Sequence, residues 1–351
     1  MAGVNQAPLG PDGIRDVSDL EDRLSEPTPG LVEAFGRLKG DVLVLGVGGK
    51  MGPTLARMAV RASVAAGIRR RVIGAARFSA PGLEERLQAW GVETVRCDLL
   101  DRASLERLPE APNVVYMAGM KFGATGQEAL TWAMNAWLPG LVCERFAGSR
   151  IVAFSTGNVY PLTPVGGGGA RESDPPGPVG EYAMSCLGRE RVFEHFSRTR
   201  GTPVATLRVT YANEMRYGVL VDLARKVFDG QAVDLGMGYV NVIWQADANA
   251  MALRALECAA APPLVLNVAG PEILSVRRVC EQYGQWFGRA PVFAGREQPD
   301  ALLINGQRAY ELFGRPRVSA EQIMGWAADW VRRGGESLGK PTHFEVRDGK
   351  F

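Results

Sequence analysis

The stretch VLVLGVGGKMG, residues 42–52, decides the fold class of this 351-residue chain. Its first four residues are aliphatic, which is typical of a strand that is buried on both faces of a parallel sheet. Glycines then allow a tight turn, and residues 51–66 have the apolar spacing of a helix. A strand, a glycine-rich turn and a helix N-terminus in this order favour a bound pyrophosphate over a purely structural turn. The residues expected to bind such a dinucleotide cofactor here are Gly46, Gly48, Gly49, Lys50, Met51 and Gly52.

Short apolar runs and helical stretches continue to alternate along the chain. Strands are expected near residues 72–75, 92–95, 113–117, 151–154 and 204–209, and further helices near 83–89, 130–146 and 182–197. This order predicts an α/β protein with a Rossmann-like, doubly wound parallel sheet and a smaller C-terminal substrate-binding lobe. The expected units are an N-terminal extension at 1–40, a dinucleotide-binding domain at 41–212, later sheet strands returning around 240–270, a mostly substrate-binding lobe at 213–335 and a tail at 336–351.

The composition excludes several classes of protein. Hydrophobic residues make up 46% and charged residues 22%, so disorder is excluded as the main state. A net charge of +2 and the lack of a long apolar run give no reason to expect a nucleic-acid or membrane partner. Five scattered cysteines without a C-x-x-C pair fit a reducing, cytoplasmic compartment. With only two histidines, far apart in the chain, no metal site is expected.

The residues after the second expected strand bear on the choice of cofactor. An NAD site usually carries an acidic residue about 20 residues after the glycine turn, where it holds the ribose hydroxyls. Residues 67–83 contain no acid, and Arg77 and Ser79 follow the strand instead. A guanidinium and a hydroxyl at these positions suit the 2′-phosphate of NADP. The alternative interpretation is that the arginine is only a solvent-exposed residue of a loop. We therefore favour NADP over NAD as the cofactor.

Five ordered motifs between residues 41 and 335 resemble the extended short-chain dehydrogenase/reductase family, in its NAD(P)-dependent epimerase/dehydratase group. Beyond the glycine turn, the matching positions are Asp98 and Leu99 at the adenine, Ala118, Gly119 and Lys121 after the fourth strand, Asn135 in a helix, Thr156 after the fifth strand and Tyr182 in the Y-x-x-x-K motif. The resemblance implies hydride transfer between the cofactor and a substrate hydroxyl or carbonyl, with Tyr182 as acid/base and Thr156 holding the substrate oxygen. It also implies a homodimer formed by the helices that carry Asn135 and Tyr182.

Cys186 stands where the family has the lysine of Y-x-x-x-K. That lysine lowers the pKa of the tyrosine. Without it, each pKa unit by which the tyrosine rises reduces the phenolate population about tenfold. The best replacement cation is Lys121, whose loop is expected beside the nicotinamide ribose, and Arg189 is the second candidate. Two alternatives stay open: the charge of the oxidised nicotinamide suffices, or the protein binds cofactor without turnover, as a sensor or scaffold.

The substrate lobe departs from the family pattern as well. Tyr211 and Val240 occupy places where nucleotide-sugar enzymes of this family keep an asparagine and an arginine near the sugar diphosphate. A free sugar, a sugar acid or another polyol-like carbonyl compound is therefore about as reasonable a substrate as a nucleotide sugar. The residues expected to contact this carbohydrate-like small molecule are Asn158, Tyr211, Arg216, Trp244 and Arg296. The sequence leaves open whether the net reaction is redox, epimerisation or dehydration.

Overall fold

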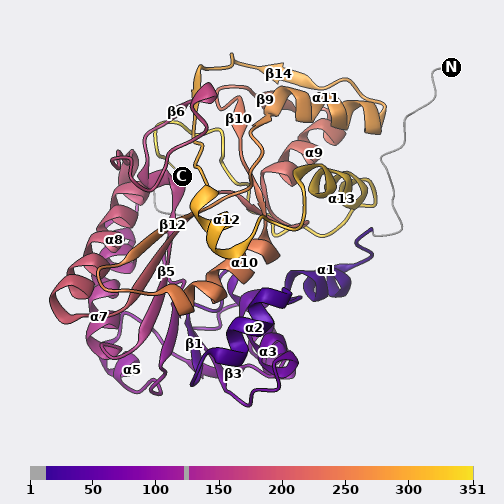
Figure 1. Cartoon of the computed structure of the whole chain (residues 1–351). Coiled ribbons are helices and arrows are strands. Elements are labelled where there is room, and N and C mark those ends of the chain that lie inside the picture. Colours follow the sequence, from indigo (N-terminus) through magenta and orange to yellow (C-terminus); the bar gives the residue numbers. More distant parts are fainter. Residues whose placement is uncertain (1–12, 122–125, 351) are drawn as a thin grey trace.

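The computed structural model describes residues 13–121 and 126–350. Its main strands are β1 (Val42–Leu45), β2 (Val72–Ala76), β3 (Glu93–Arg96), β4 (Asn113–Tyr116), β5 (Arg150–Thr156), β7 (Val204–Val209) and β12 (Leu264–Val268). In the described part of the chain they form one seven-stranded parallel sheet in the order β12-β7-β5-β4-β1-β2-β3 (Figure 1). This sheet confirms the predicted Rossmann-like fold class.

Helices cover both faces of the sheet, as its continuous apolar strands require. On one face lie α5 (Arg102–Glu106), α7 (Leu138–Arg145) and α8 (Gly180–Arg200), and on the other lie α3 (Gly52–Ala65) and α10 (Gln245–Arg254) (Figure 1). Within β1, Leu43 packs under α5, α7 and α8, and Val44 packs under α3 and α10 on the opposite face. The two side chains are separated in this way because successive side chains of a strand point to opposite faces of the sheet. A further helix, α4 (Leu83–Ala89), connects β2 to β3.

The chain changes direction at the carboxyl end of β1. This strand lies between β2 and β4, and the helices that follow β1 and β4 cover opposite faces of the sheet. Where the connections diverge in this way, a crevice opens beyond the strand ends, and open α/β sheets bind their ligands there. The glycine-rich turn after β1 and residues 117–121 after β4 form the two sides of this crevice.

The N-terminal extension is part of the folded core from Gly13 onward. It forms α1 (Val17–Leu24), capped by the Asp16 side chain, and α2 (Pro29–Arg37), capped by Thr28. Both helices pack on α3 and α10, and their apolar faces are fully buried through Leu20, Leu24, Leu31 and Phe35. Thr28 followed by Pro29 is a typical helix start, which α2 uses, whereas no helix was predicted over the residues of α1.

The helix expected over residues 130–146 is interrupted. It consists of α6 (Glu128–Trp132), a π-helical segment (Ala133–Trp137) and α7. Pro139 has no N–H to donate to the Asn135 carbonyl four residues earlier, so a regular helix would leave that oxygen without its bond. Arg189 in α8 supplies the missing donor, because its Nε lies 3.4 Å from the Asn135 oxygen.

The second lobe covers the carboxyl ends of the strands (Figure 1). Its helices are α9 (Val219–Asp229), α11 (Val276–Phe287), α12 (Gln307–Phe313) and α13 (Ala320–Arg332). Short strand pairs complete it: β8 (Ala212–Asn213) with β11 (Ile243–Trp244), β9 (Ala232–Asp234) with β14 (Val292–Ala294), β10 (Tyr239–Val240) with β13 (Leu274–Ser275), and β6 (Thr163–Pro164) with β15 (Asp300–Ala301). Among the described residues, no helix has the length and apolar character needed to span a membrane.

The C-terminal tail returns from the second lobe to the first. Thr342 is anchored to Asp222 of α9, because its N and Oγ1 lie 2.8 and 2.6 Å from the same carboxylate oxygen. Phe344 is buried, and Arg347 pairs with Asp300 at 2.5 Å. Gly349 then lies against Val179 at the start of α8. The tail is therefore fixed across the mouth of the crevice.

Candidate active site

One cavity lies beside the glycine-rich turn, and we call it the glycine cavity. Its volume is about 190 Å³. Nine residues that the sequence singled out for the cofactor meet in its walls: Gly46, Gly48, Gly49, Arg77, Ser79, Asp98, Leu99, Ala118 and Gly119. They come from the ends of β1, β2, β3 and β4. Phe78, Met117 and Met134 also line it, and they were not among the residues predicted to bind the cofactor.

The glycine cavity fits a dinucleotide on the evidence of its backbone. Gly46 has a φ of +83°, and a Cβ there would lie 2.7 Å from the Ala118 nitrogen. A Cβ on Gly52 would collide with the Val47 carbonyl. Helix α3 begins at this point, and its N-cap, Met51, makes no side-chain capping bond within the described residues. The backbone of this turn is therefore exposed where side chains would block it, and it lies in front of a helix N-terminus without a side-chain cap. Both features suit the pyrophosphate of a dinucleotide.

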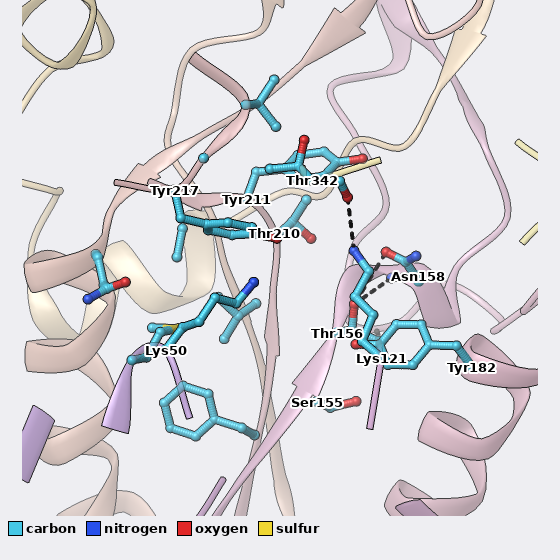
Figure 2. A pocket seen from close by; sticks show the side chains of 17 residues that line it. Lys50, Lys121, Ser155, Thr156, Asn158, Tyr182, Thr210, Tyr211, Tyr217 and Thr342 are labelled. Atoms are coloured by element: carbon cyan, nitrogen blue, oxygen red, sulfur yellow. Dashed lines mark hydrogen bonds between the residues drawn. The ribbon is translucent and has the colours of Figure 1, made fainter. Parts of the chain in front are cut away.

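A second cavity, the tyrosine cavity, lies on the other side of the turn and has a volume of about 200 Å³ (Figure 2). Seven residues that the sequence singled out line it: Lys50, Met51, Lys121, Thr156, Asn158, Tyr182 and Tyr211. Thr210, Tyr217, Gln245 and Thr342 also line it, and sequence reasoning did not name them. Lys121, Thr156 and Tyr182 lie together on one side, and Lys50 enters from the opposite side (Figure 2).

Tyr182 is partly buried and lies within reach of a cation. Burial raises the pKa of Tyr182 well above its usual value and Cys186 raises it further, whereas Arg189 and a hydrogen bond with Thr156 lower it. The Nζ of Lys121 lies 5.8 Å from the centroid of the Tyr182 ring and 3.4 Å from the Thr342 carbonyl oxygen, to which it donates. Burial lowers the pKa of Lys121 to about 8, so this side chain is mostly charged at neutral pH.

Arg189, the second candidate cation, bonds mainly to protein groups. It is buried, and its Nη1 and Nη2 donate to the Phe154 carbonyl at 2.7 Å and to Asn135 Oδ1 at 2.6 Å. It lies outside the described lining of both cavities. Its charge acts on Tyr182 from behind the cavity wall.

Asn135 holds the Lys121 loop against helix α8. Its Oδ1 accepts from the Met120 N–H, and its Nδ2 donates to the Met120 carbonyl, both at 2.9 Å. The same Nδ2 donates to Ser185 Oγ at 3.0 Å. Asn135 is fully buried and lies outside the described lining of the tyrosine cavity. This geometry makes it a positioning residue for Lys121 and Tyr182.

A buried ion pair fixes Thr156 relative to Tyr182. Glu190 of α8 accepts hydrogen bonds from Ser155 Oγ of β5 at 2.5 Å and from Arg208 of β7 at 2.6 Å. The Glu190 and Arg208 side chains are almost fully buried, so removing either one would leave the other as an uncompensated charge in the interior. This network was not found from the sequence, because its members lie up to 53 positions apart on three elements.

Three expected substrate residues lie elsewhere. Arg216 is bound by two carboxylates, Glu214 and Glu21 of the N-terminal helix α1, both at 3.1 Å. Trp244 is buried edge-to-face against Trp326, with ring centroids 5.2 Å apart. Arg296 is exposed, and all three lie outside the described lining of the tyrosine cavity.

The comparisons with known proteins agree with this architecture. The profile of the NAD dependent epimerase/dehydratase family matches residues 42–213. Over these residues, which are just under half of the chain, the sequence is similar to that family. A search of curated proteins found no match.

Solved structures with 18–20% sequence identity share the fold. UDP-glucose 4-epimerase from Thermotoga maritima, solved with UDP-glucose, is 18% identical, with a TM-score of 0.68 over 84% of this chain and 99% of its own. UDP-glucuronic acid 4-epimerase from Bacillus cereus, solved with NAD, is 18% identical, with a TM-score of 0.69 over 84% and 99%. DesIV, a dTDP-glucose 4,6-dehydratase from Streptomyces venezuelae solved with NAD, is 20% identical, with a TM-score of 0.70 over 84% and 97%.

Proposed function

We propose that this protein is an NAD(P)-dependent oxidoreductase, epimerase or dehydratase that acts on a hydroxyl or carbonyl of a sugar-like small molecule. The observation that carries the proposal is that Thr156, Tyr182 and Lys121 line one cavity, while the glycine turn and Asp98 line the cavity next to it. A nicotinamide cofactor, when bound, supplies the hydride acceptor or donor. The test is a screen of sugars and polyols for an absorbance change of the nicotinamide.

The residues of the tyrosine cavity have separable roles in this proposal. The Thr156 hydroxyl holds the substrate oxygen, and the Tyr182 phenolate takes its proton while the C–H hydride leaves the same carbon, so that a carbonyl forms. Lys121 stabilises the phenolate in place of the missing lysine, because its ammonium lies beside the ring of Tyr182. Asn158 and Tyr211 lie where they can hold further hydroxyls of the substrate.

The opposing candidate is a cofactor-binding sensor or scaffold without turnover. The replacement of the motif lysine by buried Cys186, and the raised pKa of Tyr182, favour this alternative. The same screen separates the two: a sensor binds the cofactor, gives no absorbance change with any substrate, and gains activity only when Cys186→Lys restores the cation.

The cofactor is proposed to be NADP rather than NAD, although two of the three neighbours named above were solved with NAD. Arg77→Ala is expected to weaken NADP binding about tenfold and to leave NAD unchanged, because the guanidinium would bond the 2′-phosphate. Calorimetric titration of both nucleotides measures this, with exposed Arg69→Ala as the matched control. Equal weakening of both nucleotides would contradict the assignment.

A homodimer is proposed through α6, the π-helical segment and α8, which pack together. This face exposes several large apolar side chains: Leu130, Trp132, Trp137 (54% exposed) and Met184. Trp137→Glu is expected to convert a dimer to a monomer in light scattering, because it places a charge in an apolar interface. The control is Val64→Glu, since Val64 is exposed on α3. A monomeric wild type, or a variant that stays dimeric, would contradict the proposal.

A further inference from the structure

The last described residues of the chain, 338–350, pass over the tyrosine cavity from the second lobe to the first, and we call them the strap. At one end, the N–H of Leu338 donates to the Arg216 carbonyl oxygen at 3.1 Å. At the other end, Gly349 lies against the carbonyl of Val179, where α8 begins. Because α8 also carries the proposed acid/base, the strap connects the second lobe to the helix that serves the chemistry.

Three anchors give the strap a defined position. Thr342 donates two hydrogen bonds to one carboxylate oxygen of Asp222, at 2.8 and 2.6 Å. The Phe344 ring is 2% exposed and belongs to the main hydrophobic core. Arg347 donates to an Asp300 carboxylate oxygen at 2.5 Å. The last residues of a chain fray unless they are tied down, and these anchors hold the strap to the second lobe.

The contact between the strap and α8 requires glycine. Gly180, at the start of α8, has a φ of +82°, and a Cβ there would lie 2.5 Å from the Gly349 carbonyl oxygen. Any other residue at position 180 would be strained and would push the strap away. The first turn of α8 is therefore shaped to receive the strap.

One side of helix α9 leads from the tyrosine cavity to the strap. Val219, at the start of α9, lines the cavity. Further along the same helix, Asp222 binds Thr342 and Lys226 pairs with Glu345 at 3.3 Å. Positions 219, 222 and 226 are three and four residues apart, so they lie on one side of the helix. The strap therefore fills the space along α9 into which the cavity would otherwise continue.

The strap also forms part of the cavity wall. Thr342 is 3% exposed, and its carbonyl oxygen accepts a hydrogen bond from Lys121 Nζ at 3.4 Å (Figure 2). Burial raises the pKa of the neighbouring Tyr211, and Tyr217 and Glu345 of the strap raise it further, so the Tyr211 side chain lies near the strap. Tyr211 has a φ of +46°, which bulky residues rarely adopt. Together these groups close a cavity of about 200 Å³.

The charges of the cavity suit a diphosphate poorly. Among the described residues that line it there is no arginine, the side chain that pairs best with phosphates. Arg216, which the sequence singled out for the substrate, is 9% exposed and is bound by two carboxylates. Burial, followed by the charges of Lys121 and Lys340, lowers the pKa of Lys50 to about 6, so most of this side chain is uncharged at pH 7. A neutral ligand is the better match.

Building on the function proposed above, we propose that the strap selects the substrate by size. It closes the tyrosine cavity to any large group attached to a sugar, the nucleoside diphosphate of a nucleotide sugar included, and leaves room for a free monosaccharide or a polyol of similar length. Thr342 is the specificity-determining residue, because it forms the wall. Phe344 is a positioning residue, because its burial keeps Thr342 in place.

Two variants release the strap in different ways. One ends the chain after Ser337 and removes the strap altogether. The other, Phe344→Ala, keeps the full chain and changes no charge, so its effect on ligand binding depends on the position of the strap. The matched control is Val346→Ala, which also shortens an apolar side chain of the strap, but one that is only partly buried. Thermal unfolding followed by circular dichroism shows whether each variant is folded.

The experiment is calorimetric titration with glucose, phenyl glucoside, maltose and UDP-glucose, which share a hexose and differ in what is attached to it. Each protein is titrated with and without NADP or NAD, since bound cofactor keeps other nucleotides out of the glycine cavity. We expect the wild type and Val346→Ala to bind no conjugated sugar more tightly than glucose. Both released variants should bind at least one conjugated sugar about tenfold or more tightly than the wild type does, because the colliding wall is gone.

Affinity for glucose and for the cofactor should change less than threefold in the released variants, since no described residue of the strap lines the glycine cavity. A wild type that binds UDP-glucose more tightly than glucose would overturn the inference. So would folded released variants that gain no conjugated sugar, or that gain glucose to the same extent. Failure of the proposed function looks different, because the wild type would then bind neither NADP nor NAD, or would turn over no sugar, whereas the strap is judged from binding alone.

Discussion

Replacement of Lys121 by methionine is expected to lower kcat/KM about 100-fold at pH 7, once a substrate that is turned over has been found. The reason is the position of the ammonium, which lies 5.8 Å from the Tyr182 ring centroid in a site where burial raises the pKa of that tyrosine. Methionine keeps the length and the apolar stem of the lysine side chain, so the loss of kcat/KM measures the effect of removing the Lys121 charge. The pH profile provides a second measurement, because activity that depends on charged Lys121 should fall as the pH rises above about 8.

A second substitution distinguishes a lost cation from a disturbed loop. Cys186 lies one helical turn after Tyr182, on the same face of α8. Adding Cys186→Lys to Lys121→Met should therefore recover most of the lost activity. Lys39→Met is the matched control, because Lys39 is exposed and away from both cavities. Unchanged activity in Lys121→Met would remove Lys121 from the mechanism.

Gly46→Ala is expected to weaken cofactor binding by about 100-fold. Alanine at a φ of +83° is strained by roughly 1–3 kcal/mol, and its Cβ would also push Ala118 out of the cavity wall. Because 1.4 kcal/mol corresponds to a factor of ten, the two effects together account for a loss of this size. Titration of the variant with NADP and NAD measures it.

The control for this experiment is Gly36→Ala. Gly36 lies in helix α2, and a Cβ added there meets no atom within 4 Å among the described residues. Alanine should leave cofactor affinity unchanged and stabilise the helix by up to about 1 kcal/mol. If Gly46→Ala binds cofactor as well as Gly36→Ala does, the glycine turn does not hold the dinucleotide.

The central sheet was predictable because its signals are local. Strand β1 and helix α4 have the bounds that their apolar runs indicate, and β7 likewise spans the expected residues 204–209. The π-helical segment was not predictable, because it depends on Pro139 together with Arg189, which lies 50 positions later and supplies the missing donor. Helix α1 was missed because its apolar face is short and its partners, α3 and α10, lie far along the chain.

The candidate site was predictable where it follows the strand ends. The glycine turn, Asp98 and the pair Thr156 and Tyr182 all meet at the two cavities, because the carboxyl ends of parallel strands share one edge. Thr342 could not be found in this way, since it reaches the cavity only through the returning tail. The engagement of Arg216 likewise depends on Glu21 in a helix that precedes the sheet.

The most direct test of the central claim is calorimetric titration of the wild-type chain with NADP and with NAD, repeated on Gly46→Ala. We predict a measurable heat and saturable binding of at least one nucleotide to the wild type, with affinity reduced about 100-fold in the variant. No heat for either nucleotide with the wild type, or identical affinities in the two proteins, would contradict a dinucleotide in the glycine cavity.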